Sequence, residues 1–170
     1  MADIKDYEPL WGSWYVDSVL GEGSFGKVYK VKREEFENTF YAAVKMISIP
    51  YTDSDLQLAW SELQNEESVK SHFEKYAVDI AEEIKLMSMF KGNTNIVSIE
   101  DHKVVEHKDK IGWDILIRME LLTTLSYYAF NKSLGTDEII RIGIDISHAL
   151  EFCNMKHVIH RDIKPENIFV

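Results

Sequence analysis

The C-terminal stretch of the sequence combines residue types that suit the transfer of a phosphoryl group. Asp162 is followed by Lys164 two positions later and by Asn167 five positions later, and Pro165 prevents a regular helix between them. Asp162 is able to accept a proton from a hydroxyl, Lys164 to neutralise a phosphoryl group, and Asn167 to offer a carbonyl oxygen to Mg²⁺. These three residues are the candidate catalytic group, and Asn167 is also the candidate metal ligand.

The same stretch resembles the catalytic loop of the eukaryotic-type protein kinases. Residues 160–167 read His-Arg-Asp-Ile-Lys-Pro-Glu-Asn and match every motif position of H-R-D-x-K-P-x-N. The lysine two places after the aspartate resembles the serine/threonine branch of that family. The alternative is a polar surface loop that matches by chance, which eight ordered positions make improbable. The apolar run at 168–170 predicts a strand that holds the loop.

A glycine-rich segment near the start of the chain is the second candidate. Gly21, Gly23, Gly26 and Val28 form the pattern G-x-G-x-x-G-x-V. A dinucleotide-binding turn would open directly into a helix, whereas residues 27–32 alternate apolar and charged side chains as a strand does. The loop therefore bends between two strands, as in a plain hairpin or in a kinase, where the glycines let backbone amides close over ATP phosphates. The kinase resemblance implies nucleotide contacts for Leu20, Gly21, Glu22, Gly23, Ser24, Phe25, Gly26, Lys27 and Val28.

A lysine inside an apolar strand is the third candidate. Residues 38–48 predict a strand, and Lys45 shares one face of it with Ala43. Burying a lysine costs free energy unless the lysine finds an anion. The pair resembles the A-x-K of kinases, in which the alanine lines the adenine pocket and the lysine holds the α and β phosphates. The alternative is a lysine at a sheet edge that extends its amine into water.

A long helix is predicted from about Val69 to Lys91, after an acidic, helix-prone extension at 51–72. Its apolar positions recur at three- and four-residue steps, and Glu83 falls within that face, between Ile80 and Met87. A carboxylate that faces a core needs a cation as partner. Lys45 is the candidate, in a pair that resembles the switch of active kinases. A surface glutamate is the alternative.

Two strands, around 96–105 and 113–119, follow the helix and complete a five-stranded antiparallel sheet. After them, Met119, Glu120 and Leu122 resemble the kinase hinge, with Met119 as gatekeeper and the other two facing adenine. The resemblance also places Phe169 below the adenine. Helices predicted at 123–132 and 136–156, the second capped by Thr136, lead into the catalytic loop.

The expected fold is α+β and resembles a protein kinase. Residues 1–12 form an N-terminal lead-in, and 13–122 form the kinase N-lobe and hinge, with 51–72 as an extension before the long helix. Residues 123–170 form the first helices and catalytic loop of an incomplete helical C-lobe. Because so little of that lobe is present, the apolar side of the helix at 136–156 is expected to be exposed.

The resemblance implies an ATP-dependent protein serine/threonine kinase that uses Mg²⁺ and acts on a serine or threonine hydroxyl of a protein substrate. No Asp-Phe-Gly occurs in the 170 residues, so we expect an N-terminal kinase fragment that is a poor catalyst by itself. A catalytically dead, kinase-like module that binds nucleotide or a partner is the alternative, and a decayed gene product is the third.

The composition of the chain argues against several binding partners and kinds of site. Asp and Glu number 29 against 19 Lys and Arg, and the net charge of −10 argues against a nucleic-acid-binding surface. Cys153 is the single cysteine, so neither an intrachain disulfide nor a cysteine-based metal cluster is expected. No apolar run approaches the ~20 residues of a membrane span. We therefore expect a cytoplasmic protein with no membrane segment in these residues.

Overall fold

The chain divides into two compact units in the computed structural model, which describes residues 3–23 and 26–170. The first unit comprises Met1–Met89 and Ile99–Leu121, and the second comprises Phe90–Ser98 and Leu122–Val170. Ser24 and Phe25, which the sequence assigns to the glycine loop, lie outside the described residues.

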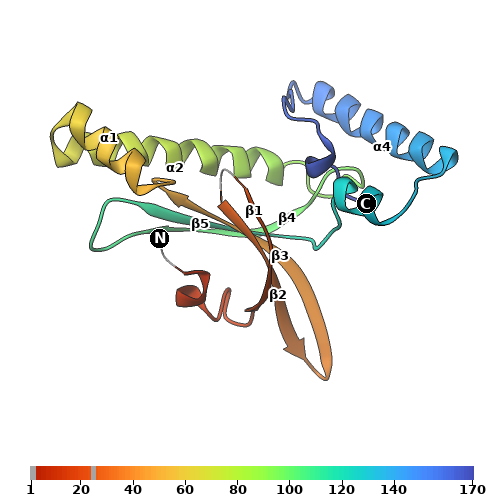
Figure 1. Ribbon diagram of the computed structural model, residues 1–170, viewed down its shortest axis with the longest axis horizontal. Coiled ribbons are helices and arrows are strands. Elements are labelled where there is room, and N and C mark those ends of the chain that lie inside the picture. Colours follow the sequence, from red (N-terminus) through yellow and green to blue (C-terminus); the bar gives the residue numbers. More distant parts are fainter. Residues whose placement is uncertain (1–2, 24–25) are drawn as a thin grey trace. The chain divides into compact units, whose positions relative to one another are not determined.

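A five-stranded antiparallel sheet forms the first unit (Figure 1), which confirms the predicted sheet. Its order is β1-β2-β3-β5-β4. The strands are β1 (Tyr15–Gly23), β2 (Gly26–Glu35), β3 (Asn38–Ile49), β4 (Ile99–Glu106) and β5 (Trp113–Met119). β5 has the predicted bounds, whereas β4 begins at Ile99 and not at Ile96.

The hairpin of β2 and β3 is longer than the strand beside it. Phe36 and Glu37 form its two-residue turn with φ of 46° and 66°, and Glu35 pairs with Asn38. β5 pairs with β3 only from Ala43 to Ile49. Residues 33–40 therefore extend beyond both β1 and β5 as a two-stranded ribbon, visible in Figure 1 below the rest of the sheet.

The two faces of the sheet bury different partners, because side chains alternate along each strand. One face of β3 presents Ile47 and Ile49 to a cluster that includes Phe73, Ala77 and Ile84 of a long helix. The opposite face presents Ala42, Val44 and Met46 to Ile4, Leu10 and Trp14. Those three residues belong to residues 3–14, which we call the N-terminal strap; it contains the 3-10 helix η1 (Ile4–Tyr7). The strap and the long helix lie on opposite sides of the sheet (Figure 1).

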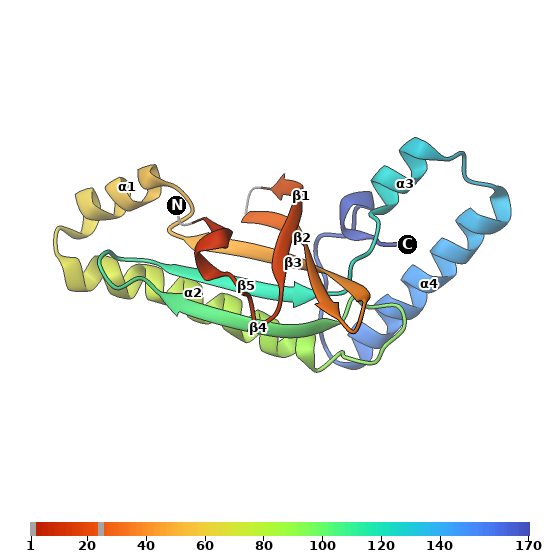
Figure 2. The ribbon, with the colours of Figure 1, turned by 90° about the horizontal axis from the view of Figure 1, so that it is seen from below.

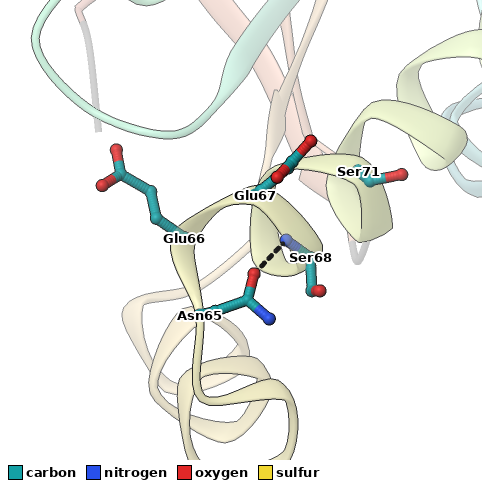
Figure 3. Close-up of a pocket in the computed structure, with 5 residues that line it drawn as sticks. All are labelled: Asn65, Glu66, Glu67, Ser68 and Ser71. Atoms are coloured by element: carbon teal, nitrogen blue, oxygen red, sulfur yellow. Dashed lines mark hydrogen bonds between the residues drawn. The ribbon is translucent and has the colours of Figure 1, made fainter.

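Two helices follow β3, where the sequence predicted an extension and one long helix. They are α1 (Asp53–Leu63) and α2 (Glu66–Ser88), so α2 begins earlier and ends earlier than the predicted 69–91. Each has its own cap: Thr52 Oγ1 accepts a hydrogen bond from Asp55 N–H, and Asn65 Oδ1 accepts one from Ser68 N–H (Figure 3). α2 contacts β3, β4 and β5, and Figure 2 shows it running beside the last two of these.

The second unit contains α3 (Leu125–Asn131), α4 (Thr136–Met155) and the 3-10 helix η2 (Pro165–Asn167). Two predictions are wrong here. Gly135, not Thr136, is the N-cap of α4, and it supplies no side-chain hydrogen bond. Residues 168–170 form no strand, because their one ladder contact is the isolated bridge between Phe169 and Thr124.

The surface of α4 is largely exposed within its unit. Cys153 is buried, as predicted for a core cysteine, but Ile139, Ile140 and Ile144 each expose about half of their area (55%, 55% and 49%). On the side that the helical spacing marks as apolar, Ile139 is exposed but Ile142 and Ile146 are partly buried, so the predicted exposure of that side is seen only in part. No helix in the described part of the chain is both long and apolar enough to cross a membrane.

Candidate active site

The described glycines of the loop are present for two different reasons. Gly26, at φ 128°, lies against β3: a Cβ added to it would be 2.1 Å from the carbonyl oxygen of Met46. Among the described residues, Gly21 has no atom within 4 Å of such a Cβ, and for Gly23 the nearest is the Gly26 carbonyl oxygen at 4.0 Å. Packing therefore requires glycine at position 26, whereas Gly21 and Gly23 leave open space beside the backbone, as an approaching phosphate would need.

The other predicted residues of the hairpin lie around this loop. Leu20 exposes 49% of its area, and Lys27 Nζ forms an exposed ion pair with Glu22 Oε2 at 3.3 Å. Val28 is paired with Lys45 in the β2–β3 register. Residues that are directly opposite on neighbouring strands point to the same side of the sheet, so Val28 and Lys45 share one face.

Lys45 lies on the α2 face of the sheet, as predicted. It is partly buried, and Ala43, two residues earlier, is 5% exposed. Across the next ladder, Lys45 is opposite Ile117 and Ala43 is opposite Met119, the predicted gatekeeper. Ala43, Lys45 and Met119 therefore lie on one face of two adjacent strands. Lys45 forms no ion pair with any carboxylate in residues 3–23 and 26–170.

Glu83 is exposed, and this corrects its predicted position within the apolar face of the helix. Ile84 is the buried residue at this level of α2. One residue is a rotation of about 100° around a helix, so Glu83 flanks the face that Ile84 occupies. Burial, and then the negative charge of Glu83, raises the pKa of Tyr51. Within the described residues Glu83 and Lys45 form no ion pair, and the kinase-like pair stays a prediction.

The catalytic loop, in the second unit, brings its three predicted residues together. Lys164 Nζ lies 2.9 Å from Asp162 Oδ2, and Asn167 Nδ2 donates to the same oxygen at 2.8 Å and to the Asp162 carbonyl at 3.0 Å. The helical turn of η2 returns Asn167 toward Asp162. His160 Nδ1 accepts a 3.3 Å hydrogen bond from Asp162 N–H. All three predicted residues are exposed.

Two backbone hydrogen bonds hold the end of this loop against the start of α3. Leu125 N–H donates to the Ile168 carbonyl at 2.7 Å, and Val170 N–H donates to the Thr123 carbonyl at 2.9 Å. Phe169 lies between them and is 39% exposed. Of the predicted hinge residues, Leu122 belongs to this unit and is 38% exposed, whereas Met119 and Glu120 belong to the first unit.

The hydrogen bonds leave specific atoms of the loop available. The bond from Lys164, with its charge and a further bond from Asn167, holds the pKa of Asp162 below its ordinary value, so this carboxylate is ionised at neutral pH. Its Oδ1 accepts no hydrogen bond from any described residue and is available to a hydroxyl. Because Asn167 donates through Nδ2, its Oδ1 is the amide atom left for a cation.

The metal that this donor set suits is Mg²⁺, which uses few protein oxygens and completes its shell with water and phosphate. Asn167 Oδ1 supplies one such oxygen. No cluster of three or more His, Cys, Asp or Glu side chains that suits a metal occurs in the residues that the structure covers. The fit of the loop to Mg²⁺ therefore depends on phosphate oxygens as further ligands.

The family model described as "Protein kinase domain" matches residues 14–170. The chain belongs to the protein kinase domain family. Its catalytic loop and the row of Val28, Lys45 and Ala43 are thus positions of a kinase domain, although the role of each residue stays a prediction.

Individual relatives from several organisms carry the names of kinases. A probable serine/threonine-protein kinase of Clostridium perfringens is 28% identical over 151 residues, which are 89% of this kinase chain and 18% of the relative. The Aurora kinase of Schizosaccharomyces pombe is 29% identical over 168 residues, 95% of this chain and 40% of the relative. Cyclin-dependent kinase-like 1 of Caenorhabditis elegans is 30% identical over 154 residues (90% and 36%). The chain spans less than half the length of each of these relatives.

A buried polar cluster in the first unit of the kinase domain was not found from the sequence. Asp114 on β5 is fully buried; Ser48 Oγ donates to its Oδ1 at 2.6 Å, and Tyr7 Oη and His107 Nε2 lie 2.5 and 2.7 Å from its Oδ2. Burial opposes ionisation, but these bonds outweigh it and hold the pKa of Asp114 below its ordinary value. The signal was a lone charge in an apolar strand, the same signal that singled out Lys45.

The hollow at the N-terminus of α2 is not part of the kinase site. Asn65, Glu66, Glu67, Ser68 and Ser71 line it (Figure 3), and none of these is a predicted site residue. Its one hydrogen bond in the figure is the Asn65 cap of α2.

Proposed function

We propose that this chain carries the nucleotide-binding residues and the catalytic loop of a serine/threonine protein kinase that transfers the γ-phosphoryl group of ATP to a protein hydroxyl. The observation that carries the proposal is the arrangement of Lys164 and Asn167 on a single oxygen of Asp162. It leaves the other oxygen, Oδ1, to accept the proton of a serine or threonine hydroxyl.

In this proposal the remaining residues bind and orient the nucleotide. Gly21 and Gly23 allow the backbone to approach the phosphates, and Lys45 pairs with the α and β phosphates. Ala43 and Met119 line the space for adenine. Asn167 Oδ1 would hold Mg²⁺, and the ion would supply positive charge beside the phosphates. Lys164 stabilises charge on the γ-phosphoryl group.

Asp162→Asn tests the proposal directly. Asparagine keeps the size of the side chain but is not a base, so we expect phosphate transfer to a protein substrate such as casein to fall by a factor of roughly 10²–10⁴. Asp145→Asn, at an exposed position of α4, is the matched control and is expected to transfer normally. The readout is radiolabel from γ-labelled ATP, followed by analysis of the labelled amino acid. Equal transfer in Asp162→Asn, or label on tyrosine alone, contradicts the proposal.

A second candidate function is a kinase-like module that binds nucleotide without transferring phosphate. The exposed position of Glu83 and the missing ion pair with Lys45 favour it. Both candidates predict that ATP with Mg²⁺ raises the melting temperature of the protein. Only the module predicts that this stabilisation occurs without any transfer of phosphate to protein.

A further inference from the structure

The N-terminal strap packs against the back of the strand that carries Lys45. Ile4, Leu10 and Trp14 are 1%, 3% and 5% exposed, so their side chains are as buried as those of the sheet. The sheet residues in the same cluster are Val31, Ala42, Val44, Met46 and Leu116. Without the strap, this apolar face would be in contact with water.

Tyr7 joins the strap to a carboxylate that also joins two other elements. Its hydroxyl donates to Asp114 on β5, which in turn accepts from Ser48 on β3 and from His107 after β4. Asp114 is 0% exposed. Removing the donor from a buried carboxylate is costly because water does not replace it. The strap is therefore fixed at one defined point as well as by apolar contact.

Stacked rings and a side-chain hydrogen bond hold the remainder of the strap. The guanidinium of Arg118 lies over Trp11 at 5.3 Å and over Trp14 at 5.0 Å, and that of Arg33 lies over Trp14 at 5.1 Å. Glu8 Oε1 accepts a 2.6 Å hydrogen bond from Val16 N–H.

The strap contacts both neighbours of Lys45. Val44 and Met46 precede and follow the lysine on β3, and their side chains point toward the strap while that of Lys45 points to the other face. The backbone of Met46 also supports the glycine loop, because its carbonyl oxygen leaves no room for a Cβ on Gly26. The segment Val44–Met46 of β3 thus packs against the strap on one face of the sheet and also sets the positions of Lys45 and Gly26.

We propose that the docked strap supports nucleotide binding and so acts as a latch, with Tyr7 as its positioning residue. The hydrogen bond from Tyr7 to Asp114 keeps the strap docked against the sheet. The docked strap in turn holds Lys45 and Gly26 in the positions that a nucleotide requires. This inference rests on the proposed function, because it takes ATP with Mg²⁺ as the ligand. The strap has a docked and a released state, and nucleotide binds the docked state more tightly. Coupling of this kind is reciprocal, so nucleotide also favours docking.

Tyr7→Phe is the test, since it removes the donor and keeps the ring. We expect hydrogen exchange at the amides of residues 4–14, measured by mass spectrometry, to become about tenfold faster or more. The dissociation constant of a fluorescent ATP analogue with Mg²⁺ is expected to rise about fivefold or more. Tyr15→Phe makes the same chemical change at a half-exposed hydroxyl on β1 and is expected to change neither quantity.

Two further measurements separate a latch from ordinary stabilisation. Saturating nucleotide is expected to slow exchange of the strap in the unmodified protein, which a merely structural strap would not show. Ser48→Ala removes the donor to the other oxygen of Asp114 without touching the strap, so its effect on strap exchange is expected to be smaller than that of Tyr7→Phe.

The outcomes are distinguishable from failure of the proposed function. Unchanged strap exchange in Tyr7→Phe, or faster exchange with unchanged nucleotide affinity, overturns the latch. Equal effects of Ser48→Ala and Tyr7→Phe on the strap also overturn it, because the carboxylate would then act through the sheet alone. If the unmodified protein binds no nucleotide at all, both the proposed function and its coupling to the strap are wrong. Hydrogen exchange of residues 4–14 in Tyr7→Phe still shows in that case whether Tyr7 keeps the strap docked.

Discussion

Gly26 and Gly21 belong to one motif, yet the structure gives them separate tasks. A side chain at position 26 meets the Met46 carbonyl, and the φ of 128° is unfavourable for any residue with a Cβ. At position 21 a Cβ would meet no atom of the described residues within 4 Å. A side chain at position 26 therefore disturbs the packing of the fold, whereas one at position 21 does not.

We predict that Gly26→Ala lowers the free energy of unfolding by about 1–3 kcal/mol or more, because the strand pair must move apart. Gly21→Ala is the matched control for stability and is expected to change it by about 0.5 kcal/mol at most. Gly21→Ala is instead expected to weaken nucleotide binding. Urea unfolding and nucleotide titration of both variants measure this split, and equal stability losses would contradict it.

Asp114 predicts how stability depends on pH. Its pKa is lowered in the folded protein, so its contribution to stability is present above the unfolded pKa of about 3.9 and is lost as the pH falls through the folded value. In Asp114→Asn we expect a loss of about 1–3 kcal/mol at neutral pH and a shallower decline in acid.

The control for this prediction is Asp109→Asn, at an exposed position of the turn before β5. We expect it to keep the acid-dependent loss of the unmodified protein. The free energy of unfolding between pH 2.5 and 7 gives both curves. Parallel curves for Asp114→Asn and the unmodified protein would show that this carboxylate does not contribute to the pH dependence.

Helix α2 shows which features of a helix can be predicted from the apolar pattern of its sequence and which cannot. The cap at Asn65 allows the helix to begin at Glu66, which lies inside the extension predicted at 51–72 and before the predicted helix start at Val69. Apolar residues at the three- and four-residue steps of that pattern, Phe73, Ala77 and Ile84 among them, are buried in the structure, because a period of 3.6 is set by the backbone. It did not fix the orientation of Glu83, since one step of about 100° separates a core position from a flanking one.

The Asn65 cap carries the prediction at this scale. Asn65→Ala removes the acceptor for Ser68 N–H and is expected to cost about 1 kcal/mol of stability. Ser71→Ala, at an exposed position that makes no cap, is the control. Chemical denaturation of the two variants measures the difference. A loss of equal size in both would mean that the cap does not stabilise α2.

Sequence separation explains which parts of the site were predictable. Asp162, Lys164 and Asn167 lie within six residues, so one short loop brings them together. Lys45 and Glu83 come from different elements, and their meeting depends on how a helix packs on a sheet. The cluster at Asp114 draws on the strap, β3 and the segment before β5, and only a lone charge in an apolar strand indicated it.

Across the whole molecule, the acidic balance of the sequence and the apolar surface of α4 have opposite effects. A net charge of −10 opposes association between copies, whereas Ile139, Ile140 and Ile144 offer an apolar face that promotes it. The exact residues of this face follow from the fold of the second unit.

We predict that Ile144→Glu reduces self-association while changing the free energy of unfolding by about 0.5 kcal/mol at most, because this side chain is half exposed within its unit. Ile142→Glu, two residues earlier on the more buried side of α4, is expected to destabilise the protein. Sedimentation velocity and thermal unfolding distinguish the two effects. If Ile144→Glu associates as strongly as the unmodified protein, the apolar face of α4 is not the cause of self-association.

The overhanging ribbon at 33–40 has a practical consequence. Its turn at Phe36 and Glu37 lies beyond the end of β5, and Phe36 exposes 91% of its area. Extra residues at that tip would lengthen the chain in water without disturbing the ladder between β3 and β5 that holds Lys45. The tip is therefore the natural attachment point for a fluorophore or an affinity tag that must leave the nucleotide-binding strand untouched.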